Sequence, residues 1–390
     1  MNTNQIMERD RQYILGTYRR NELCISKGSG SVCWSPEGKR YIDFSSGIGV
    51  NSLGYSDEGW VDAVTRQLRT LQHTSNLFYT EPCGALAEIL VNRTGFDKVF
   101  FCNSGAEANE GAIKAARKYS LQKYGAGRYD IITLQNSFHG RTLATITATG
   151  QDDYHKYFDP FMEGFVYSKL NDHEDLKGKI TDRTCAVMAE LIQGEGGVNR
   201  LEEDYVRELH DLCKEKDILL IIDEVQTGIG RTGKLFAYEH FGIRPDMVTM
   251  AKGLGAGLPI GGILFGESCS HVLQQGDHGT TFGGNPAVCA GAIEVLNRID
   301  NKFLDQVAKK GDYMKSRIEK MDGVDMVTGL GLMLGVSLKD KEAKEVVKNA
   351  LELGLITLTA KSRIRLLPPL NISDEELDEG LELLEKAIRG

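Results

Sequence analysis

The stretch Ile218-Leu219-Leu220-Ile221-Ile222-Asp223-Glu224 sets five consecutive apolar residues directly before two acids. A short run of apolar, largely β-branched residues is typical of a strand that is buried on both faces of a parallel sheet. Open α/β sheets bind their ligands outside the carboxyl ends of such strands. The stretch therefore predicts an α/β fold with a functional acid, Asp223, at the edge of a buried sheet.

The regions on both sides of this strand alternate between short apolar runs and helical patterns. Further strands are predicted at residues 98–102, 130–134, 185–189 and 246–250, and helices over 82–92, 105–120 and 202–216. Short buried strands that alternate with helices indicate a mostly parallel sheet with helices on both faces. We therefore expect a large α/β lobe in the middle of the chain.

The two ends of the chain show other patterns. A small β-meander is predicted over residues 31–55. Beyond Pro286, helices are predicted through about residue 320 and over 340–354, strands at 331–336 and 363–367, and a last helix that opens at Ser373-Asp374-Glu375-Glu376 with a capping-box pattern.

The length favours two lobes, because a single core stops growing near about 250–300 residues and this chain has 390. We assign residues 1–50 to an N-terminal segment that packs with the small domain, 51–290 to a large cofactor-binding domain and 291–390 to a small α+β domain.

The composition excludes several classes of protein. With 41% apolar and 26% charged residues, the chain is globular rather than disordered. The net charge of −9 and the lack of a basic cluster disfavour a nucleic-acid partner. No apolar run approaches the length of about 20 residues that crosses a bilayer, and Met1 to Gly16 contain no export signal. We expect a soluble, cytoplasmic protein that acts on a small molecule, with no membrane partner.

The eight cysteines are scattered along the chain with no C-x-x-C pair. Paired cysteines at short spacing would indicate zinc or a thioredoxin-like site. We therefore expect reduced thiols and no metal site.

A second strand end carries a lysine. The strand predicted at 246–250 is followed by Ala251-Lys252 and then by a glycine-rich stretch. Because carboxyl ends of parallel strands meet at one edge, Lys252 and Asp223 are expected to face the same crevice. A buried carboxylate needs a cationic partner, such as Arg, Lys, a metal ion or the protonated ring nitrogen of a cofactor. Taken alone, Asp223 is compatible with a strand-end turn and Lys252 with a solvated amine.

Pyridoxal 5′-phosphate (PLP) would account for both residues. Its aldehyde forms a Schiff base with a lysine, and its pyridine nitrogen has to keep a proton, which a buried aspartate favours. Asn103-Ser104-Gly105-Ala106 follows the strand at 98–102, so N–H groups of Gly105 and Ala106 at a helix N-terminus can bind the phosphate. Taken alone, this string is also typical of ordinary helix capping.

Ser137-Phe138-His139-Gly140-Arg141-Thr142 follows the strand at 130–134. Phe138 can stack on the pyridine ring, and Arg141 can bind a substrate carboxylate as a bidentate pair. By themselves, Phe138 would be a core residue and Arg141 half of a surface ion pair.

A nucleotide site is a competing hypothesis. Gly228-Ile229-Gly230-Arg231-Thr232-Gly233-Lys234-Leu235 matches G-x-G-x-x-G and the first seven positions of a Walker A loop. Leu235 stands where a P-loop needs Ser or Thr, and five residues separate the strand from the first glycine. We therefore favour a glycine-rich turn.

Together, six strings occur in the order found in class III aminotransferases, which the chain resembles from about Trp34 to the C-terminus. They are Asn103–Glu110, Phe138–Thr142, Gln193–Gly197, Asp223–Gly228, Ala251–Gly253 and Thr280–Pro286. This resemblance implies a PLP-dependent aminotransferase of fold type I, with a mostly parallel central sheet in a large domain and a smaller α+β domain. It also implies a homodimer whose active sites lie at the subunit interface.

The resemblance implies a role for each matching residue. Lys252 would bond the cofactor aldehyde, and Asp223 would hold the pyridinium proton. Gly105 and Ala106 would bind the cofactor phosphate, and Thr281 would reach this phosphate from the neighbouring subunit. Phe138 would stack on the ring, and Gln226 would contact the ring hydroxyl. The substrate contacts would come from Arg141, Arg365, Glu195 and Thr280. Arg363 lies two residues from Arg365 on the same strand face and competes for its role.

The resemblance further implies the reaction. We expect the terminal amino group of N2-acetyl-L-ornithine to pass to 2-oxoglutarate, which gives N-acetyl-L-glutamate 5-semialdehyde and L-glutamate in arginine biosynthesis. Ornithine, succinylornithine and 4-aminobutyrate are alternative donors. An aminomutase or racemase on the same residues, and a catalytically inactive homologue, are further alternatives. Glu195 is expected to mask Arg365 while a terminal amine is bound, since an unpaired buried guanidinium is costly.

Three departures from the family pattern limit the choice of donor. Ala106 stands where many relatives have Thr, and Glu190-Leu191-Ile192 lacks the usual Pro. The segment Thr17–Leu23, which helps to shape the amine pocket in this family, also lacks its usual Pro.

Overall fold

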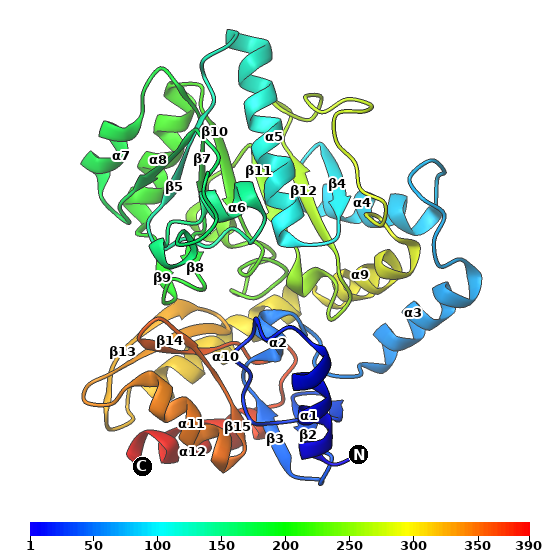
Figure 1. The fold of residues 1–390 in the computed structure, drawn as a ribbon, viewed down its shortest axis with the longest axis vertical. Helices are drawn as coiled ribbons and strands as arrows, with labels where there is room; N and C mark the ends of the chain where they lie inside the picture. The colour runs from blue at the N-terminus through cyan, green and yellow to red at the C-terminus, as the bar shows by residue number, and fades with distance from the viewer.

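A computed structural model describes residues 1–390. The chain forms an upper lobe around a large sheet and a lower lobe that contains both termini (Figure 1). The upper lobe holds the seven-stranded sheet, in the order β4 (Lys98–Cys102), β12 (Gly261–Phe265), β11 (Met247–Met250), β10 (Leu219–Asp223), β7 (Thr184–Ala189), β5 (Asp130–Leu134) and β6 (Phe165–Ser168).

The seven strands run parallel except β12, which is antiparallel to both of its neighbours. Every residue of β5, β7, β10, β11 and β12 is buried, whereas the edge strands β4 and β6 are partly exposed. Burial on both faces is what their continuous apolar runs predict. The expected mostly parallel sheet is confirmed.

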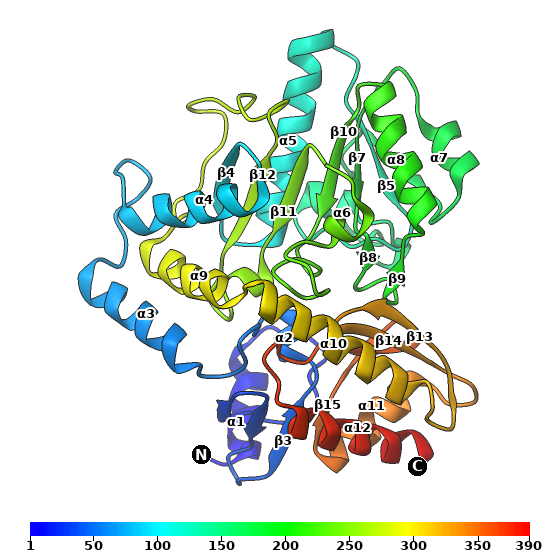
Figure 2. The same cartoon turned by 180° about the vertical axis from the view of Figure 1, so that it is seen from behind.

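Helices cover both faces of this sheet. The helix α5 (Gly105–Tyr124) lies on one face, and α4 (Glu81–Thr94), α7 (His173–Lys179) and α8 (Glu203–Glu215) lie on the other (Figures 1 and 2). The buried side of α5 consists mainly of Ala and Gly, so the helix approaches the sheet closely. At Gly111, a β-carbon would stand 2.5 Å from Ile263 Cδ1.

The lower lobe combines a second sheet with three helices. The sheet has the order β13 (Val324–Leu330), β14 (Met333–Leu338), β17 (Arg363–Leu366) and β16 (Leu358–Ala360). The helices are α10 (Asn301–Ile318), α11 (Ala343–Leu353) and α12 (Asp374–Arg389). Ser373 caps α12 by accepting a hydrogen bond from the Glu376 N–H, as the sequence predicts for its start.

The N-terminal strands join this lobe. β1 (Lys27–Ser29), β2 (Val32–Trp34) and β3 (Arg40–Asp43) form an antiparallel meander, and β15 (Leu355–Ile356) pairs in parallel with β3. The remaining elements are α1 (Thr3–Tyr13), α2 (Ser46–Gly49), α3 (Glu58–Thr70), α6 (Leu143–Ala148), α9 (Pro286–Arg298), β8 (Ile192–Gln193), β9 (Asn199–Arg200) and the 3₁₀ helices η1 (Asp152–Tyr154), η2 (Ala237–Phe241) and η3 (Lys252–Leu254).

The helical region after Pro286 is divided. α9 ends at Arg298, and the Asp300 side chain caps α10 by accepting from the Phe303 N–H at 2.7 Å. α9 crosses residue 290, where the large domain was expected to end, and packs against α3 and α4. The proposed domain limits stay a prediction.

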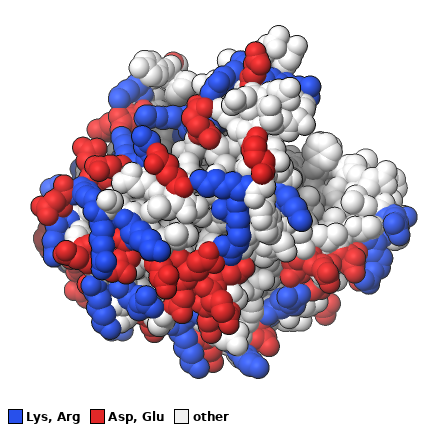
Figure 3. Space-filling view, turned by 90° about the horizontal axis from the view of Figure 1, so that it is seen from below, with Lys and Arg blue, Asp and Glu red and all other residues white.

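Charged side chains of both signs alternate over much of the lower face, and acidic groups gather near its middle (Figure 3). The first turn of α12 carries three acidic residues, Asp374, Glu375 and Glu376, which suit the N-terminus of a helix. None of the helices combines the length and the apolar content needed to pass through a bilayer.

Candidate active site

A cavity of about 450 Å³ lies outside the carboxyl ends of β4, β5, β10 and β11. Eight of the residues expected at the site line it: Gly105, Ala106, Phe138, Arg141, Glu195, Asp223, Gln226 and Lys252. They come from separate loops, which the parallel sheet brings to one edge.

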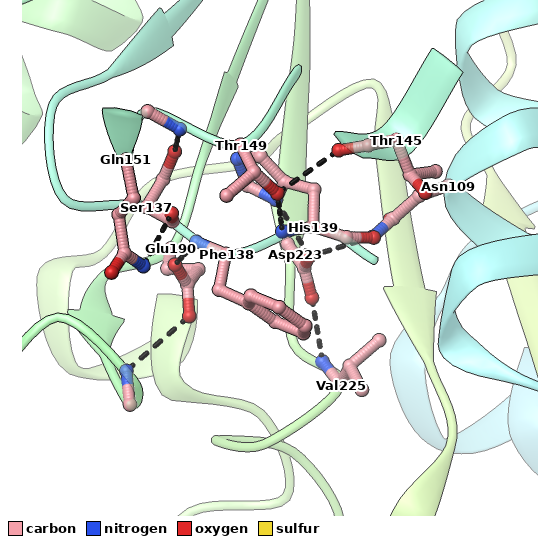
Figure 4. Close-up of polar contacts among 12 residues, drawn as sticks. Asn109, Ser137, Phe138, His139, Thr145, Thr149, Gln151, Glu190, Asp223 and Val225 are labelled. Carbon is pink, nitrogen blue, oxygen red and sulfur yellow. Dashed lines mark hydrogen bonds and ion pairs between the residues drawn. The ribbon is translucent and has the colours of Figure 1, made fainter. Parts of the chain in front are cut away.

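Asp223, the last residue of β10, is 4% exposed and fixed by three hydrogen bonds (Figure 4). Its Oδ2 accepts from Asn109 Nδ2 and from His139 Nδ1–H, both at 2.8 Å, and its Oδ1 accepts from the Val225 N–H at 3.0 Å. Three hydrogen bonds from separate segments leave the carboxyl group little freedom to rotate. Asp223 therefore has a fixed orientation at the cavity wall.

His139 is bonded to Asp223 and is also affected by the charge of a second buried acid, Glu190. Burial alone would lower the pKa of His139, but its hydrogen bond to Asp223 and the charges of Asp223 and Glu190 raise it. Burial raises the pKa of Glu190 to about 7, although His139 opposes this. Glu190 accepts from the Phe138 N–H at 2.8 Å and from the Gly194 N–H at 3.3 Å, so it also fixes the backbone of the Phe138 loop (Figure 4).

Lys252 follows β11 as the first residue of η3, with a left-handed φ of 37° that is unusual for a residue with a side chain. Burial lowers the pKa of Lys252, and the nearby charge of Arg365 lowers it further, while Glu195 and Asp223 oppose the effect. A lowered pKa increases the fraction of neutral amine, the form that attacks an aldehyde.

The N-terminus of α5 forms another part of the cavity wall. Ser104 caps this helix by accepting from the Glu107 N–H at 3.2 Å, and the first-turn N–H groups of Gly105 and Ala106 have no intrahelical partner. A β-carbon at Gly105 would stand 2.7 Å from Val225 Cγ1, so only glycine fits between this turn and the loop after β10. Exposed N–H groups at a helix N-terminus bind phosphate.

Arg365, which is buried, forms an ion pair with the half-buried Glu195. Its Nη1 lies 2.6 Å from Glu195 Oε1 and also donates to Gln226 Oε1 at 3.3 Å. Burial would raise the pKa of Glu195, but Arg365 and Lys252 lower it, so the carboxylate stays ionised. Arg363 is bound elsewhere, through Nη1 to the Gly197 carbonyl and to Asn199 Oδ1.

Gln226 lies against the backbone of the Glu195 loop. A β-carbon at Gly194 would stand 2.2 Å from Gln226 Oε1. The lack of a side chain at Gly194 therefore leaves room for the Gln226 side-chain amide beside Arg365.

Arg141 is exposed at the cavity mouth, and no carboxylate lies within ion-pair distance of it. Its guanidinium carbon lies 4.3 Å from the ring centroid of Tyr154 and 5.7 Å from that of Phe138. An arginine without a protein anion keeps all its donors for a ligand.

Three expected residues lie outside the cavity lining: Arg365, which reaches the lining residue Glu195 through its ion pair, Thr280 and Thr281. Thr280 Oγ1 accepts from the Nδ2 of Asn103, a lining residue, at 2.8 Å. Thr281 is exposed and does not reach the cavity of its own chain. The role expected for Thr281, at the site of a second subunit, stays a prediction.

The glycine-rich stretch 228–235 does not form a phosphate-binding loop. It continues into the short η2 rather than into an α-helix, and its Arg231 is buried with Nη1 donating to the Leu332 carbonyl at 3.0 Å. The stretch lies between β10 and β11 of the large sheet and contacts the lower lobe through Arg231.

The contacts of Asn109, His139 and Glu190 around Asp223 and Phe138 were not predicted from the sequence. A signal was present for Asn109, since it is a polar residue on the small, buried face of a predicted helix and lies one turn after Gly105. His139 sits between Phe138 and Arg141 in one string, but nothing in the string shows that it faces Asp223.

The residues of the cavity fit PLP. They provide an oriented carboxylate for a protonated ring nitrogen, an amine of lowered pKa for an aldehyde, and free N–H groups for a phosphate. Arg141 and the Glu195–Arg365 pair remain available for substrate carboxylates.

Comparisons with known proteins agree with this arrangement. Residues 16–388 match the family model "Aminotransferase class-III". The chain is 50% identical to the acetylornithine aminotransferase of Haemophilus ducreyi over 390 residues, which is 100% of this chain and 99% of the relative.

Two solved structures are also similar. The Toxoplasma gondii ornithine aminotransferase, with PLP at partial occupancy in its active site, has a TM-score of 0.94 and 32% identity over 99% of this chain and 94% of its own. The Stenotrophomonas maltophilia N-acetylornithine aminotransferase has a TM-score of 0.85 and 37% identity over 98% of both chains.

Proposed function

Since the chain belongs to the class III aminotransferases, we propose that it transfers the terminal amino group of N2-acetyl-L-ornithine to 2-oxoglutarate. The products would be N-acetyl-L-glutamate 5-semialdehyde and L-glutamate, and the pathway served is arginine biosynthesis. One observation carries the reaction class: Lys252 and Asp223 line the same cavity. The choice of donor is supported by full-length relatives named acetylornithine aminotransferase, at 50% and 48% identity.

The cofactor of this family is PLP, which when bound supplies an electron sink for the carbon–hydrogen bond that breaks. Lys252 would bond its aldehyde, Asp223 would keep its ring nitrogen protonated, and Phe138 would stack on the ring. Gly105 and Ala106 would bind its phosphate, and Gln226 would contact the ring hydroxyl. His139 and Asn109 would orient Asp223 through the hydrogen bonds that they donate to it.

Lys252 would also move the proton. With a lowered pKa, its Nζ can accept a proton from the substrate carbon as a general base, and it would then donate that proton to the cofactor carbon as a general acid.

Two arginines would let one cavity accept two unlike substrates. Arg141 would bind the carboxylate far from the reacting group in both the amine donor and 2-oxoglutarate. Arg365 would bind the second carboxylate of 2-oxoglutarate, next to its reacting carbon. While the terminal amine is bound, Glu195 would neutralise Arg365, because a buried guanidinium without an anion is costly.

The active form would be a homodimer. Large apolar side chains are exposed around Thr280 and Thr281 in this single chain, with exposed fractions of 87% for Leu77, 67% for Phe78 and 60% for Phe282. Apolar surface that gathers in this way is typical of a subunit interface. Thr281 of the partner subunit would then complete the phosphate site. The eight free cysteines are compatible with the reducing cytoplasm as the place of action.

A donor panel tests this function. The purified holoprotein is mixed separately with N2-acetylornithine, ornithine, succinylornithine and 4-aminobutyrate, and the loss of the near-visible absorbance of bound PLP is followed. We expect N2-acetylornithine to bleach the band fastest and 2-oxoglutarate to restore it. Faster bleaching by another donor would contradict the donor assignment, and turnover without 2-oxoglutarate would contradict amino transfer in favour of a mutase.

A further inference from the structure

Arg141 is an exposed cation whose position depends on aromatic rings rather than on an acid. Its guanidinium carbon lies 4.3 Å from the centroid of the Tyr154 ring, closer than to the Phe138 ring at 5.7 Å. No hydrogen bond or ion pair to another protein group holds it. An unattached arginine samples many rotamers, so binding a ligand in one orientation would cost conformational entropy.

Tyr154 is itself well anchored beside the Arg141 loop. It ends η1, where its N–H donates to the Gln151 carbonyl at 3.0 Å. The Gln151 side chain donates to the Ser137 carbonyl at 3.0 Å, which ties η1 to the loop that carries Phe138 and Arg141 (Figure 4). The Tyr154 ring also meets the Phe138 ring edge-on, with centroids 5.5 Å apart.

We propose that Tyr154 is a positioning residue that holds the Arg141 guanidinium in the orientation that binds the distal carboxylate of the substrate. This inference rests on the proposed function, in which Arg141 contacts that carboxylate. A ring contacts the flat face of a guanidinium, whereas a carboxylate binds to its edge. Tyr154 therefore restrains Arg141 without occupying the N–H groups that the substrate needs, which a protein acid in its place would do.

The competing role for Tyr154 is packing against Phe138 alone. That role would affect every substrate to the same extent, because Phe138 would stack on the cofactor that all substrates share rather than contact the distal carboxylate. A role through Arg141 affects only substrates that carry this carboxylate. Two donors that differ in this one group distinguish the two roles.

The test compares N2-acetylornithine with N-acetylputrescine, the same amine without its carboxylate. Both donors are assayed with the holoenzymes of wild type, Tyr154→Phe, Tyr154→Leu and Arg141→Ala. Tyr157→Leu serves as the matched control, because Tyr157 lies three residues away, is 83% exposed and contacts no arginine. Glutarate binding to each holoenzyme, measured by titration calorimetry, provides a readout that is independent of turnover.

We expect Tyr154→Leu to lower kcat/KM for N2-acetylornithine and to weaken glutarate binding by about five- to thirtyfold, the range of a cation–π contact. The loss should lie mainly in KM, N-acetylputrescine should react as with wild type, and Tyr154→Phe, which keeps the ring, should stay within about twofold of wild type. If Tyr154→Leu does not fold, Tyr154→Gln removes the ring equally well.

Four results would overturn the inference. The first is an equal loss for both donors in Tyr154→Leu, which would assign Tyr154 to packing on Phe138. The second is a loss in Tyr154→Phe as large as that in Tyr154→Leu. The third is an Arg141→Ala protein that still prefers the carboxylate-bearing donor, which would also remove Arg141 from the proposed function. Loss of that preference in Arg141→Ala but not in Tyr154→Leu would overturn the inference and leave the proposed function intact.

Discussion

At the scale of single residues, the use of two unlike substrates depends on Glu195. Replacing it with Ala leaves the buried Arg365 without its 2.6 Å partner whenever a terminal amine is bound. We expect Glu195→Ala to lower kcat/KM for N2-acetylornithine relative to that for L-glutamate by about tenfold or more, because an uncompensated buried charge is costly. Separate half-reaction rates for the two amino donors measure this ratio.

Glu203→Ala is the matched control for Glu195, since Glu203 pairs with Arg200 on the surface and its side chain is 56% exposed. The masking role of Glu195 is wrong if the ratio of the two half-reactions does not change.

The buried acid Glu224 should make the free energy of unfolding depend on pH. Burial raises the pKa of Glu224 from 4.5 to about 7. Between these values the folded protein keeps the proton while the unfolded chain has lost it, so stability falls as the pH rises from 4.5 toward 7. Glu224→Gln removes this dependence, whose full size is about 3 kcal/mol at most.

Thermal unfolding of the apoprotein at several pH values measures the Glu224 effect. Relative to wild type, Glu224→Gln should gain stability as the pH rises toward 7 and show a constant difference above it. A difference that does not vary with pH would mean that Glu224 is ionised throughout.

The identities of the main site residues were predictable from the sequence because each follows a recognisable strand or opens a recognisable helix. Their partners were not, since a contact such as that between His139 and Asp223 joins residues far apart in the chain. The competition between Arg363 and Arg365 also needed the fold: both lie on one strand, but only Arg365 reaches Glu195.

At the scale of elements, the first turn of α5 has to fit against the loop after β10. A β-carbon at Gly105 would stand 2.7 Å from Val225 Cγ1, and the Val225 N–H in turn donates to Asp223. We expect Gly105→Ala to displace both the phosphate-binding turn and the Asp223 loop, and to weaken PLP retention by about tenfold or more. Equilibrium dialysis of PLP measures this loss.

Two further variants control for helix propensity at Gly105. Gly178→Ala, in α7 with open space around its Cα, should retain PLP as wild type does. Adding Val225→Ala to Gly105→Ala should recover most of the loss, because it removes the clash. An unimpaired Gly105→Ala protein would show that this turn does not hold the phosphate.

The elements themselves were predicted to different degrees. Four of the five fully buried strands, β5, β7, β10 and β11, were correct to within about a residue, because a continuous apolar run of this length between two helical patterns is typical of a strand buried on both faces. β12 was missed because it begins with Gly261-Gly262, inside a stretch that the sequence presents as a glycine-rich loop. The break between α9 and α10 was missed because the apolar spacing continues across Ile299 and Asp300.

At the scale of the whole molecule, the apolar surface near Thr281 predicts the homodimer. Phe282 lies 5.4 Å from His73 between ring centroids, and its side chain is 60% exposed. Burying such a side chain contributes about 1.5–3 kcal/mol, so a charge in its place opposes association. We expect Phe282→Glu to shift the protein toward the monomer, with weaker PLP retention, in sedimentation velocity and PLP dialysis.

Met326→Glu, on β13 in the lower lobe, places the same charge at a residue that is 44% exposed and should leave the assembly unchanged. A wild-type protein that sediments as a monomer at all concentrations would refute the dimer.

The proposed enzyme binds PLP through Lys252, in the cavity that the fixed carboxylate of Asp223 also lines. The most direct measurement reduces the holoprotein with borohydride, digests it and locates the phosphopyridoxyl group by mass spectrometry. We expect the added mass on the peptide that contains Lys252 and on no other. A phosphopyridoxyl group on a different lysine, such as Lys234 of the glycine-rich stretch, would contradict the assignment of Lys252.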